Sequence, residues 1–145
     1  MIKTVLAAAG VALALTGFSV SAAEVVEPDS PSLYIISPEN GAHVTSPVTV
    51  RFGLKGMGVA PAGVDKPNTG HHHLLIDVDP ATIDLENAVP ADEQHIHFGG
   101  GQTEADVVLS PGEHTLRLLL GDMNHIPLDP PGFSAPVTIT VDATE

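Results

Sequence analysis

The sequence predicts an all-β fold: a single antiparallel β-sandwich of immunoglobulin-like type with about seven strands. Short segments in which apolar and polar residues alternate recur along the chain, and a period of two marks a strand with one buried face. Glycine and proline, 14 and 13 of the 145 residues, separate these segments. No window shows sustained helical spacing, although residues 80–88 could form one or two turns. A small closed β-barrel is the alternative architecture.

The alternation defines the strands in chain order. In the second of them Val48, Val50 and Phe52 alternate with polar residues, and the later segments repeat this pattern. Because only 3% of the residues are aromatic and none is tryptophan, the core must consist of valine, leucine and isoleucine, unlike that of antibody domains. The apolar segments lie at 33–36, 48–54, 74–78, 107–109, 116–120 and 137–141.

The N-terminal residues 1–23 have the pattern of a secretory signal peptide. Lys3 supplies the positive charge, an apolar run follows, and Ser21-Ala22-Ala23 resembles a cleavage site. We expect residues 24–32 to be a short tether and residues 33–142 to form one sandwich domain. The protein is therefore expected to be periplasmic or secreted, without membrane association after cleavage. The chain has no cysteine, which excludes disulfide bonds and thiolate metal ligands.

The charge is strongly negative. The chain has 18 acidic residues against 5 lysines and arginines, a formal net charge of −13 at pH 7. Such a protein repels phosphate backbones and anionic lipids and attracts cations. We therefore expect no nucleic-acid partner, and the sequence indicates no particular protein partner.

Two His-x-His pairs form the strongest candidate for a functional site. Residues i and i+2 of a strand share a face, so His71 and His73 project together, as do His95 and His97. On adjacent strands, about 4.8 Å apart, these imidazoles can converge on one metal ion. His125 is a further candidate ligand from a loop.

Two long segments, residues 56–70 and 121–133, interrupt the strand pattern, and loops of this length usually carry function. Both lie at one end of the sandwich if the strands before them run the same way. They contain Met57 and Met123, candidate thioether ligands that would shift the preference of the site toward copper. The residues expected to orient the ligand rings are His72, Asp77 and Asp122.

Other interpretations of the histidines stay open. His72 points with Leu74 and Ile76 toward the core, where a backbone carbonyl would satisfy it. His43 and His114 lie in turn-like contexts and are expected at the surface. The two His-x-His pairs are equally compatible with a hydrogen-bond network that rigidifies one end of the sandwich, or with solvated histidines that have no role.

Few residues suit catalysis. The chain has no cysteine nucleophile and no serine in a Gly-x-Ser-x-Gly turn. The glycines of residues 98–102 lack the Lys-Ser/Thr of a phosphate-binding loop and favour a left-handed turn or bulge near the histidines. We expect the protein not to be an enzyme, a metalloenzyme that activates water being the remaining alternative.

Several motifs resemble those of a family of exported bacterial domains known as domain of unknown function 4399. These motifs are GMGVAPAG, GHHHLLID, HFGGGQTE, LSPGEHTLRLLLGDMNH and PVTITV, and the resemblance extends over about residues 50–142. It implies an exported small β domain and no established activity. The motif residues that become candidates for the family's site are His72, His73, His97, Gly101, Asp122 and His125.

The sequence therefore favours an exported binding protein that holds a transition metal through the histidine cluster, with methionine as a further ligand type. Copper is the preferred cofactor and zinc the alternative. The competing hypothesis is a non-catalytic immunoglobulin-like structural or interaction module without a metal, whose histidines are structural. Stabilisation by an added ion would distinguish the two hypotheses.

Overall fold

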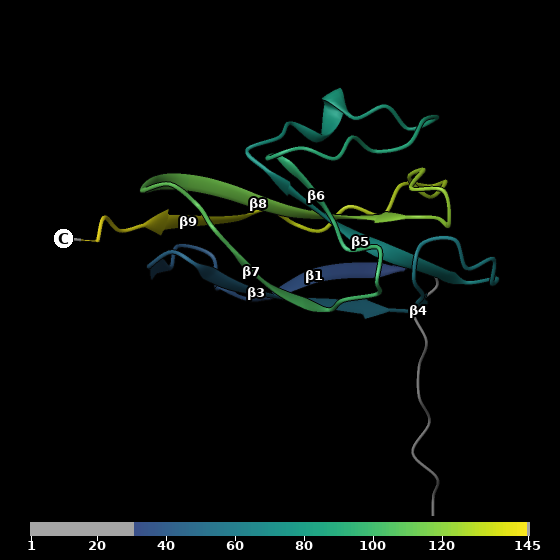
Figure 1. The fold of residues 1–145 in the computed structure, drawn as a ribbon, viewed down its shortest axis with the longest axis horizontal. Coiled ribbons are helices and arrows are strands. Elements are labelled where there is room, and N and C mark those ends of the chain that lie inside the picture. Colours follow the sequence, from purple (N-terminus) through teal and green to yellow (C-terminus); the bar gives the residue numbers. More distant parts are fainter. Residues whose placement is uncertain (1–30, 145) are drawn as a thin grey trace, which may run out of the picture.

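The structure, a computed structural model, describes residues 31–144 as two β-sheets that pack face to face (Figure 1). The all-β antiparallel sandwich predicted from the sequence is confirmed, and neither sheet closes into a barrel. The predicted signal peptide and all but the last two residues of the predicted tether lie outside the described residues. Within residues 31–144, no helix is both long and apolar enough to cross a membrane.

The first sheet has three antiparallel strands in the order β1-β3-β7. They are β1 (Ser32–Ser37), β3 (Val48–Lys55) and β7 (Glu104–Val107). Along β3, Val48 and Val50 are buried whereas Thr49 and Arg51 are exposed, as the period of two predicts. A β-bulge interrupts the pairing between Ile35 and Ser37.

The second sheet has the order β2-β9-β8-β5-β4, and β6 also pairs with β5. The pairs β2–β9 and β4–β5 are parallel, and the others are antiparallel. The strands are β2 (His43–Val44), β4 (Gly58–Val59), β5 (Thr69–Ile76), β6 (His95–His97), β8 (Gly112–Gly121) and β9 (Val137–Val141). The structure thus assigns nine strands within residues 31–144, where about seven were expected; β2 and β4 have two residues each.

The division of strands between the sheets follows the immunoglobulin pattern. In chain order, β1, β3 and β7 occupy the positions of strands A, B and E, and β5, β8 and β9 those of strands C, F and G. The two long loops that follow β3 and β8 therefore lie at one end of the sandwich. Their contact is direct, because the Gly63 amide donates to the Met123 carbonyl at 2.9 Å.

The main core fills the space between the sheets. It contains 14 buried apolar side chains. Because the complete burial of one leucine stabilises a fold by about 1.5–3 kcal/mol, this core is the main source of stability. His72 joins this core, with its ring centroid 5.3 Å from that of Phe52. The apolar members are Leu33, Val48, Val50, Phe52, Leu74, Ile76, Phe98, Val107, Leu109, Leu116, Leu118, Leu120, Ile139 and Val141.

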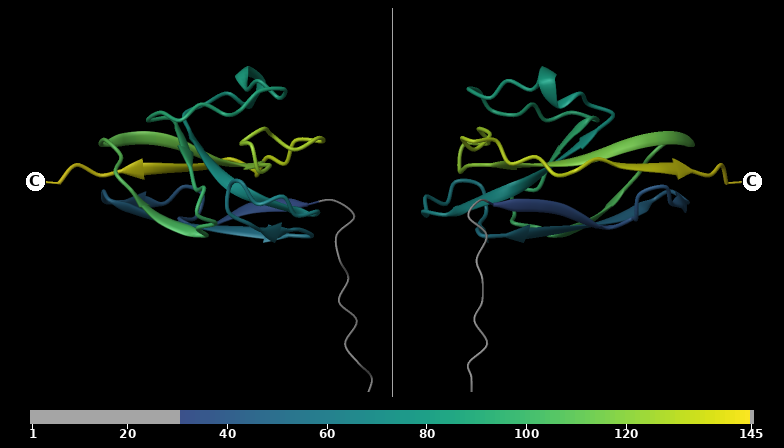
Figure 2. Two further views of the ribbon diagram at one scale, coloured as in Figure 1. Left: turned by 45° about the vertical axis from the view of Figure 1, so that its right-hand side comes forward. Right: turned by 180° about the vertical axis from the view of Figure 1, so that it is seen from behind.

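A second, smaller apolar cluster covers the outer face of the β5–β8 pair. Leu75 and Leu119, both fully buried, contact Val89 from the segment 77–94 and are packed by Phe133. Figure 2 shows this segment on the outer side of the second sheet. Its single 3-10 turn, Pro80–Thr82, falls within the segment where one or two turns were expected.

Candidate metal centre

Four histidine rings gather on the outer face of the second sheet. His71 and His73 come from β5, His97 from β6, and His125 from the loop after β8. Antiparallel pairing places His73 directly opposite His97. The six separations between ring centroids range from 4.4 to 5.9 Å, so every ring is near the other three. The predicted convergence of imidazoles from separate segments is therefore present.

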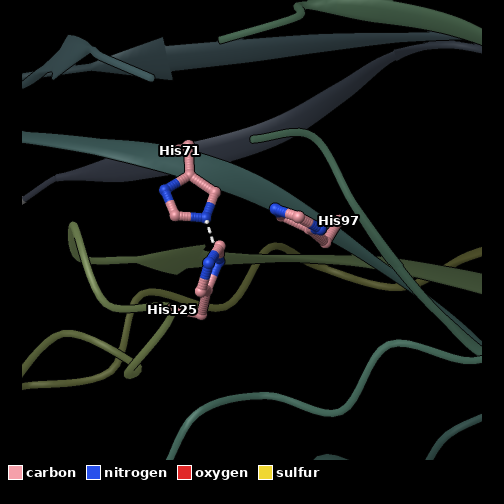
Figure 3. A group of neighbouring side chains, drawn as sticks. All are labelled: His71, His97 and His125. Carbon is pink, nitrogen blue, oxygen red and sulfur yellow. Dashed lines mark hydrogen bonds between the residues drawn. The ribbon is translucent and has the colours of Figure 1, made fainter. Parts of the chain in front are cut away.

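Three of these rings already present nitrogen atoms to one another (Figure 3). One nitrogen from each of His71, His97 and His125 lies within 4.8 Å of the other two. His71 Nε2 and His125 Nδ1 share a hydrogen bond of 3.0 Å. His71 is fully buried, His125 is half-buried and His97 is exposed, so the group has one closed side and one side open to solvent.

Several buried imidazole nitrogens of the cluster have no hydrogen-bond partner of good geometry within the described part of the chain. They are Nδ1 of His71 and both ring nitrogens of His73, a side chain with 0% exposure. Leaving a buried polar group unpaired costs about 1–3 kcal/mol. Hydrogen bonds among the described residues therefore do not satisfy the cluster, and these nitrogens are free to act as ligands.

The environment keeps the buried rings neutral. Burial, together with the nearby imidazoles of His125 and His97, lowers the pKa of His71 to about 4. Burial and the three other rings lower the pKa of His73 to about 3. Slight burial of the ring and the nearby imidazole of His125 also lower the pKa of His97, although the residue as a whole is exposed. Because a metal ion binds only the unprotonated nitrogen, these rings are available as ligands at neutral pH.

Asp122 shapes the loop that carries His125. Its Oδ1 accepts hydrogen bonds from the amides of Asn124 at 2.7 Å and Ile126 at 2.9 Å. His125 adopts a φ of +67°, a left-handed conformation in which histidine is more common than most residues. The Val89 amide donates to the His125 carbonyl at 2.9 Å and ties this loop to the segment 77–94. Asp122 thus acts through the backbone of the loop.

Two glycines make room for the rings. A Cβ atom on Gly121 would lie 2.5 Å from Cε1 of His73, and one on Gly99 would collide with Nε2 of His97. Sequence reasoning missed this role. The signal was present, since only Phe98 separates Gly99 from the HIH motif, and Gly121, at the end of β8, pairs with His71. Gly101, a candidate from the family motif, instead has a φ of +80°, as a left-handed turn requires.

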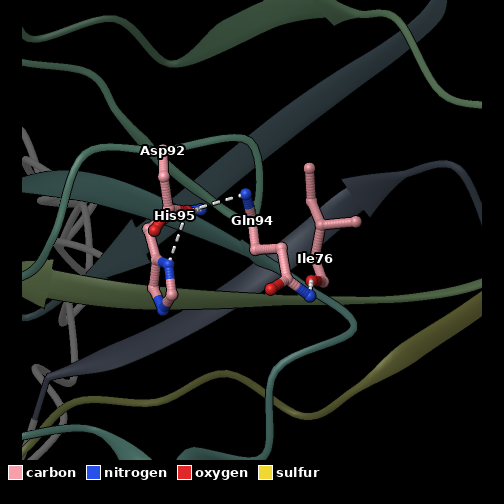
Figure 4. A network of polar contacts seen from close by, with 4 residues as sticks. All are labelled: Ile76, Asp92, Gln94 and His95. Atoms are coloured by element: carbon pink, nitrogen blue, oxygen red, sulfur yellow. Dashed lines mark hydrogen bonds and ion pairs between the residues drawn. The ribbon is translucent and has the colours of Figure 1, made fainter.

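His95 lies outside the cluster, although its side chain is on the same face of the sheet as those of His73 and His97. It pairs with Leu75, which lies two residues after His73 on β5. Its Nδ1 contacts Asp92 Oδ1 at 2.7 Å, and the neighbouring Gln94 side chain donates to the Ile76 carbonyl at 3.4 Å (Figure 4). The structure thus separates His95 from the other predicted ligands.

Asp77, which was expected to orient a ligand ring, lies at the other end of β5 from His71. Its Oδ2 contacts Nδ1 of His114 at 2.7 Å, and its Oδ1 accepts from the Thr115 amide at 2.7 Å. Burial acts to lower the pKa of His114, but the hydrogen bonds with Asp77 and Ser110 outweigh it and the pKa is raised. This pair fastens β5 to β8.

The two candidate methionine ligands, Met57 and Met123, are not in the group of side chains that the structure brings together. Met57 packs against the core between the sheets, on the opposite face of β5 from the rings. Met123 is half-buried, and its backbone carbonyl accepts the hydrogen bond from Gly63. His43, expected at the surface, is exposed and contacts Asp142 at 3.0 Å.

The donor set favours particular ions. The group of His71, His97 and His125 offers three imidazole ligands. Imidazole suits zinc, copper, nickel and iron. Magnesium and calcium prefer carboxylate and carbonyl oxygens. The cluster can therefore hold a transition-metal ion.

Comparison with known proteins agrees with the resemblance seen in the motifs. The model of the family described as domain of unknown function (DUF4399) matches residues 50–142, a stretch that contains all four clustered histidines. No curated protein and no solved structure matches the chain. Because the family model covers more than half of the chain, the protein belongs to the DUF4399 family.

Proposed function

We propose that the protein is an exported binding protein that holds one transition-metal ion through His71, His97 and His125. The observation that supports this most directly is the approach of three imidazole nitrogens to within 4.8 Å from segments far apart in sequence. Two of these rings, His71 and His97, have a lowered pKa, so they bind an ion without first losing a proton at neutral pH.

Copper(II) is the ion that we favour, before zinc. For sites built from nitrogen ligands, affinity among the divalent ions of the first transition row is highest for copper(II). The absence of cysteine from the sequence removes the thiolate ligands typical of structural zinc sites. Because Met57 lies on the other face of β5, the preference rests on the imidazoles and not on a thioether.

Two features of the whole chain support a role in binding metal outside the cytoplasm. The signal-peptide pattern of residues 1–23 supports export. The net charge of −13 attracts cations to the protein surface. Handling of, or tolerance to, a transition metal in the periplasm or outside the cell is the role that we infer.

Calorimetric titration with copper(II), and separately with zinc(II), tests the proposal. We expect the wild-type protein to bind one equivalent of copper(II), more tightly than zinc(II). His97→Ala removes an exposed ligand and should weaken binding at least about tenfold, since even the loss of a residue that supports a ligand costs 10–100-fold. His43→Ala, an exposed histidine paired with Asp142, is the matched control and should bind as the wild type does.

Gly99→Ala provides a second variant that keeps every histidine. The added methyl group would displace the His97 ring, so we expect weaker metal binding with little change in secondary structure by circular dichroism. Equal and weak binding by the wild type, His97→Ala and Gly99→Ala would refute the proposal. It would favour the alternative in which the protein is a structural module.

A further inference from the structure

We infer that His73 is a fourth ligand, so that the centre surrounds its ion with four imidazoles and holds it as cargo in a closed coordination shell. This inference rests on the proposed function and deepens it. The proposal above needs only the three rings whose nitrogens already approach one another. His73 lies outside that group of three, and three independent observations place it in the shell.

The first observation is the spacing of the rings. A metal–nitrogen bond of about 2.0–2.1 Å puts each imidazole centroid about 3.2 Å from the ion. Four such rings are then roughly 5.2 Å apart in a tetrahedron, and about 4.5 Å (neighbours) or 6.4 Å (opposite rings) apart in a square plane. The six separations in the structure, 4.4–5.9 Å, agree closely with this range. The His73 ring is 4.7, 5.7 and 5.9 Å from those of His71, His97 and His125.

Rotation of the His73 ring about its Cβ–Cγ bond would change the direction of its nitrogens without moving the ring as a whole. The centroid of an imidazole lies near the extension of the Cβ–Cγ bond, so rotation about that bond moves the nitrogens and leaves the centroid almost in place. This torsion is broad in histidine and carries little energetic cost. The positions of the four ring centroids are therefore a better guide to the ligand shell than the direction in which a His73 nitrogen points in this structure.

The second observation is the state of the His73 nitrogens. The side chain has 0% exposure, and neither Nδ1 nor Nε2 has a hydrogen-bond partner of good geometry among residues 31–144. The nearby backbone of His71 offsets only part of the lowering of the His73 pKa by burial. Burying an imidazole in this way is unfavourable unless something binds it. The neighbouring rings of the cluster are three other imidazoles, which are donors to a metal and would bind the same ion as His73.

The third observation is the close contact between the His73 ring and the backbone of Gly121. Gly121 lies against His73, where any Cβ would lie 2.5 Å from Cε1 and 3.0 Å from Nδ1. The φ of Gly121 is not positive, so its backbone does not require glycine. The requirement for a small residue therefore comes from the ring that it accommodates.

A fourth imidazole changes what the centre does. Catalytic metal sites keep a position open for water or substrate, whereas a site with four protein ligands is closed. With His71 and His73 buried and His97 exposed, the ion enters and leaves from the His97 side. A closed all-nitrogen shell of this kind suits binding and release of a borderline ion such as copper(II), and not activation of water.

Electron paramagnetic resonance of the copper(II)-loaded protein tests the inference, with pulsed measurements that count the coordinated imidazoles. We expect four in the wild type and three in His73→Leu, with affinity at least tenfold lower in the variant. Gly121→Ala displaces the ring without removing it and should also lower the count to three. His72→Leu is the matched control, because His72 is equally buried on the same strand but faces the core; it should keep four.

The possible outcomes separate this inference from the proposed function. Three imidazoles in the wild type, with a spectrum unchanged in His73→Leu or Gly121→Ala, would refute the fourth ligand and leave metal binding intact. Failure of the wild type to bind copper(II) at all would refute both. If His73→Leu does not fold, as circular dichroism would show, the result for Gly121→Ala decides the question.

Discussion

His72 is a buried histidine of β5 on the side that faces the core. Burial lowers its pKa to about 4, and the nearby backbone of Gln102 offsets only part of this effect. Neither ring nitrogen has a hydrogen-bond partner of good geometry within the described chain. His72 was expected to find a backbone carbonyl in the core. The core position is confirmed, but the expected hydrogen bond with a backbone carbonyl does not reach good geometry.

The low pKa of His72 makes stability depend on pH in a definite direction. An unfolded histidine has a pKa of about 6.5, so between pH 6.5 and pH 4 the unfolded chain binds a proton that the folded chain does not. Stability is therefore complete above pH 6.5 and falls as the pH is lowered through this window. His71 and His73 act in the same direction, down to about pH 4 and pH 3.

We expect the metal-free protein to lose several kcal/mol of unfolding free energy between pH 7.5 and pH 5, at up to about 1.4 kcal/mol per pH unit for each buried histidine. His72→Leu should remove about one histidine's share of this decrease, because it replaces an unsatisfied polar ring with an apolar side chain. Urea unfolding at several pH values measures the decrease in unfolding free energy in the wild type and in His72→Leu. The same pH dependence in the wild type and in His72→Leu would contradict this assignment.

The loop that follows β8 depends on one carboxylate. Asp122 accepts two backbone amides and so fixes the path that brings His125 over the buried rings. The sequence indicated Asp122 as a partner of a ligand ring. In the structure it supports the backbone from which one candidate ligand projects, and its charge acts to raise the pKa of His71 against the larger lowering effects.

We expect Asp122→Ala to lower the affinity for copper(II) by roughly 10–100-fold, the usual cost of losing a residue that orients a ligand. Asp122→Asn retains an oxygen that accepts the Asn124 and Ile126 amides, and it should keep most of the affinity. Competition with a chelator of known affinity measures the difference. If the alanine and asparagine variants bind equally well, the backbone hydrogen bonds of Asp122 do not position His125.

At the scale of the molecule, the histidine cluster and the main core are on opposite faces of β5. The core between the sheets consists of apolar side chains and His72, none of which requires an ion. The sandwich is therefore expected to fold without metal, in contrast to small domains whose folding energy comes from the ion. Metal binding should add to a stability that already exists.

We expect the protein treated with a chelator to unfold cooperatively on heating, because the apolar core is complete without an ion. Copper(II) at a free concentration of one hundred times the dissociation constant should then stabilise it by about 2.7 kcal/mol, or a rise in Tm of about 10 °C. Differential scanning calorimetry measures the rise, and His97→Ala should reduce or abolish it. Loss of cooperative unfolding in the chelated wild type would show that the fold depends on metal.

Much of the architecture follows from local periodicity. Alternation along residues 48–54 and 116–120 is sufficient to predict β3 and β8, because one face of each strand must be buried against the other sheet. The strands β2 and β4, with two residues each, escaped prediction since a period cannot appear in so short a segment. Their pairing is decided by the path of the chain around the sandwich.

The sequence by itself determined that His71 and His73 share one face of a strand, because the alternation of side chains is a local property of the backbone. Only the tertiary structure decided which further histidines meet them. His95 and His97 are two residues apart, yet the register of β6 against β5 brings His97 opposite His73 and leaves His95 beside Leu75. Register and loop path are set by packing between segments distant in sequence, and a local pattern carries no information about them.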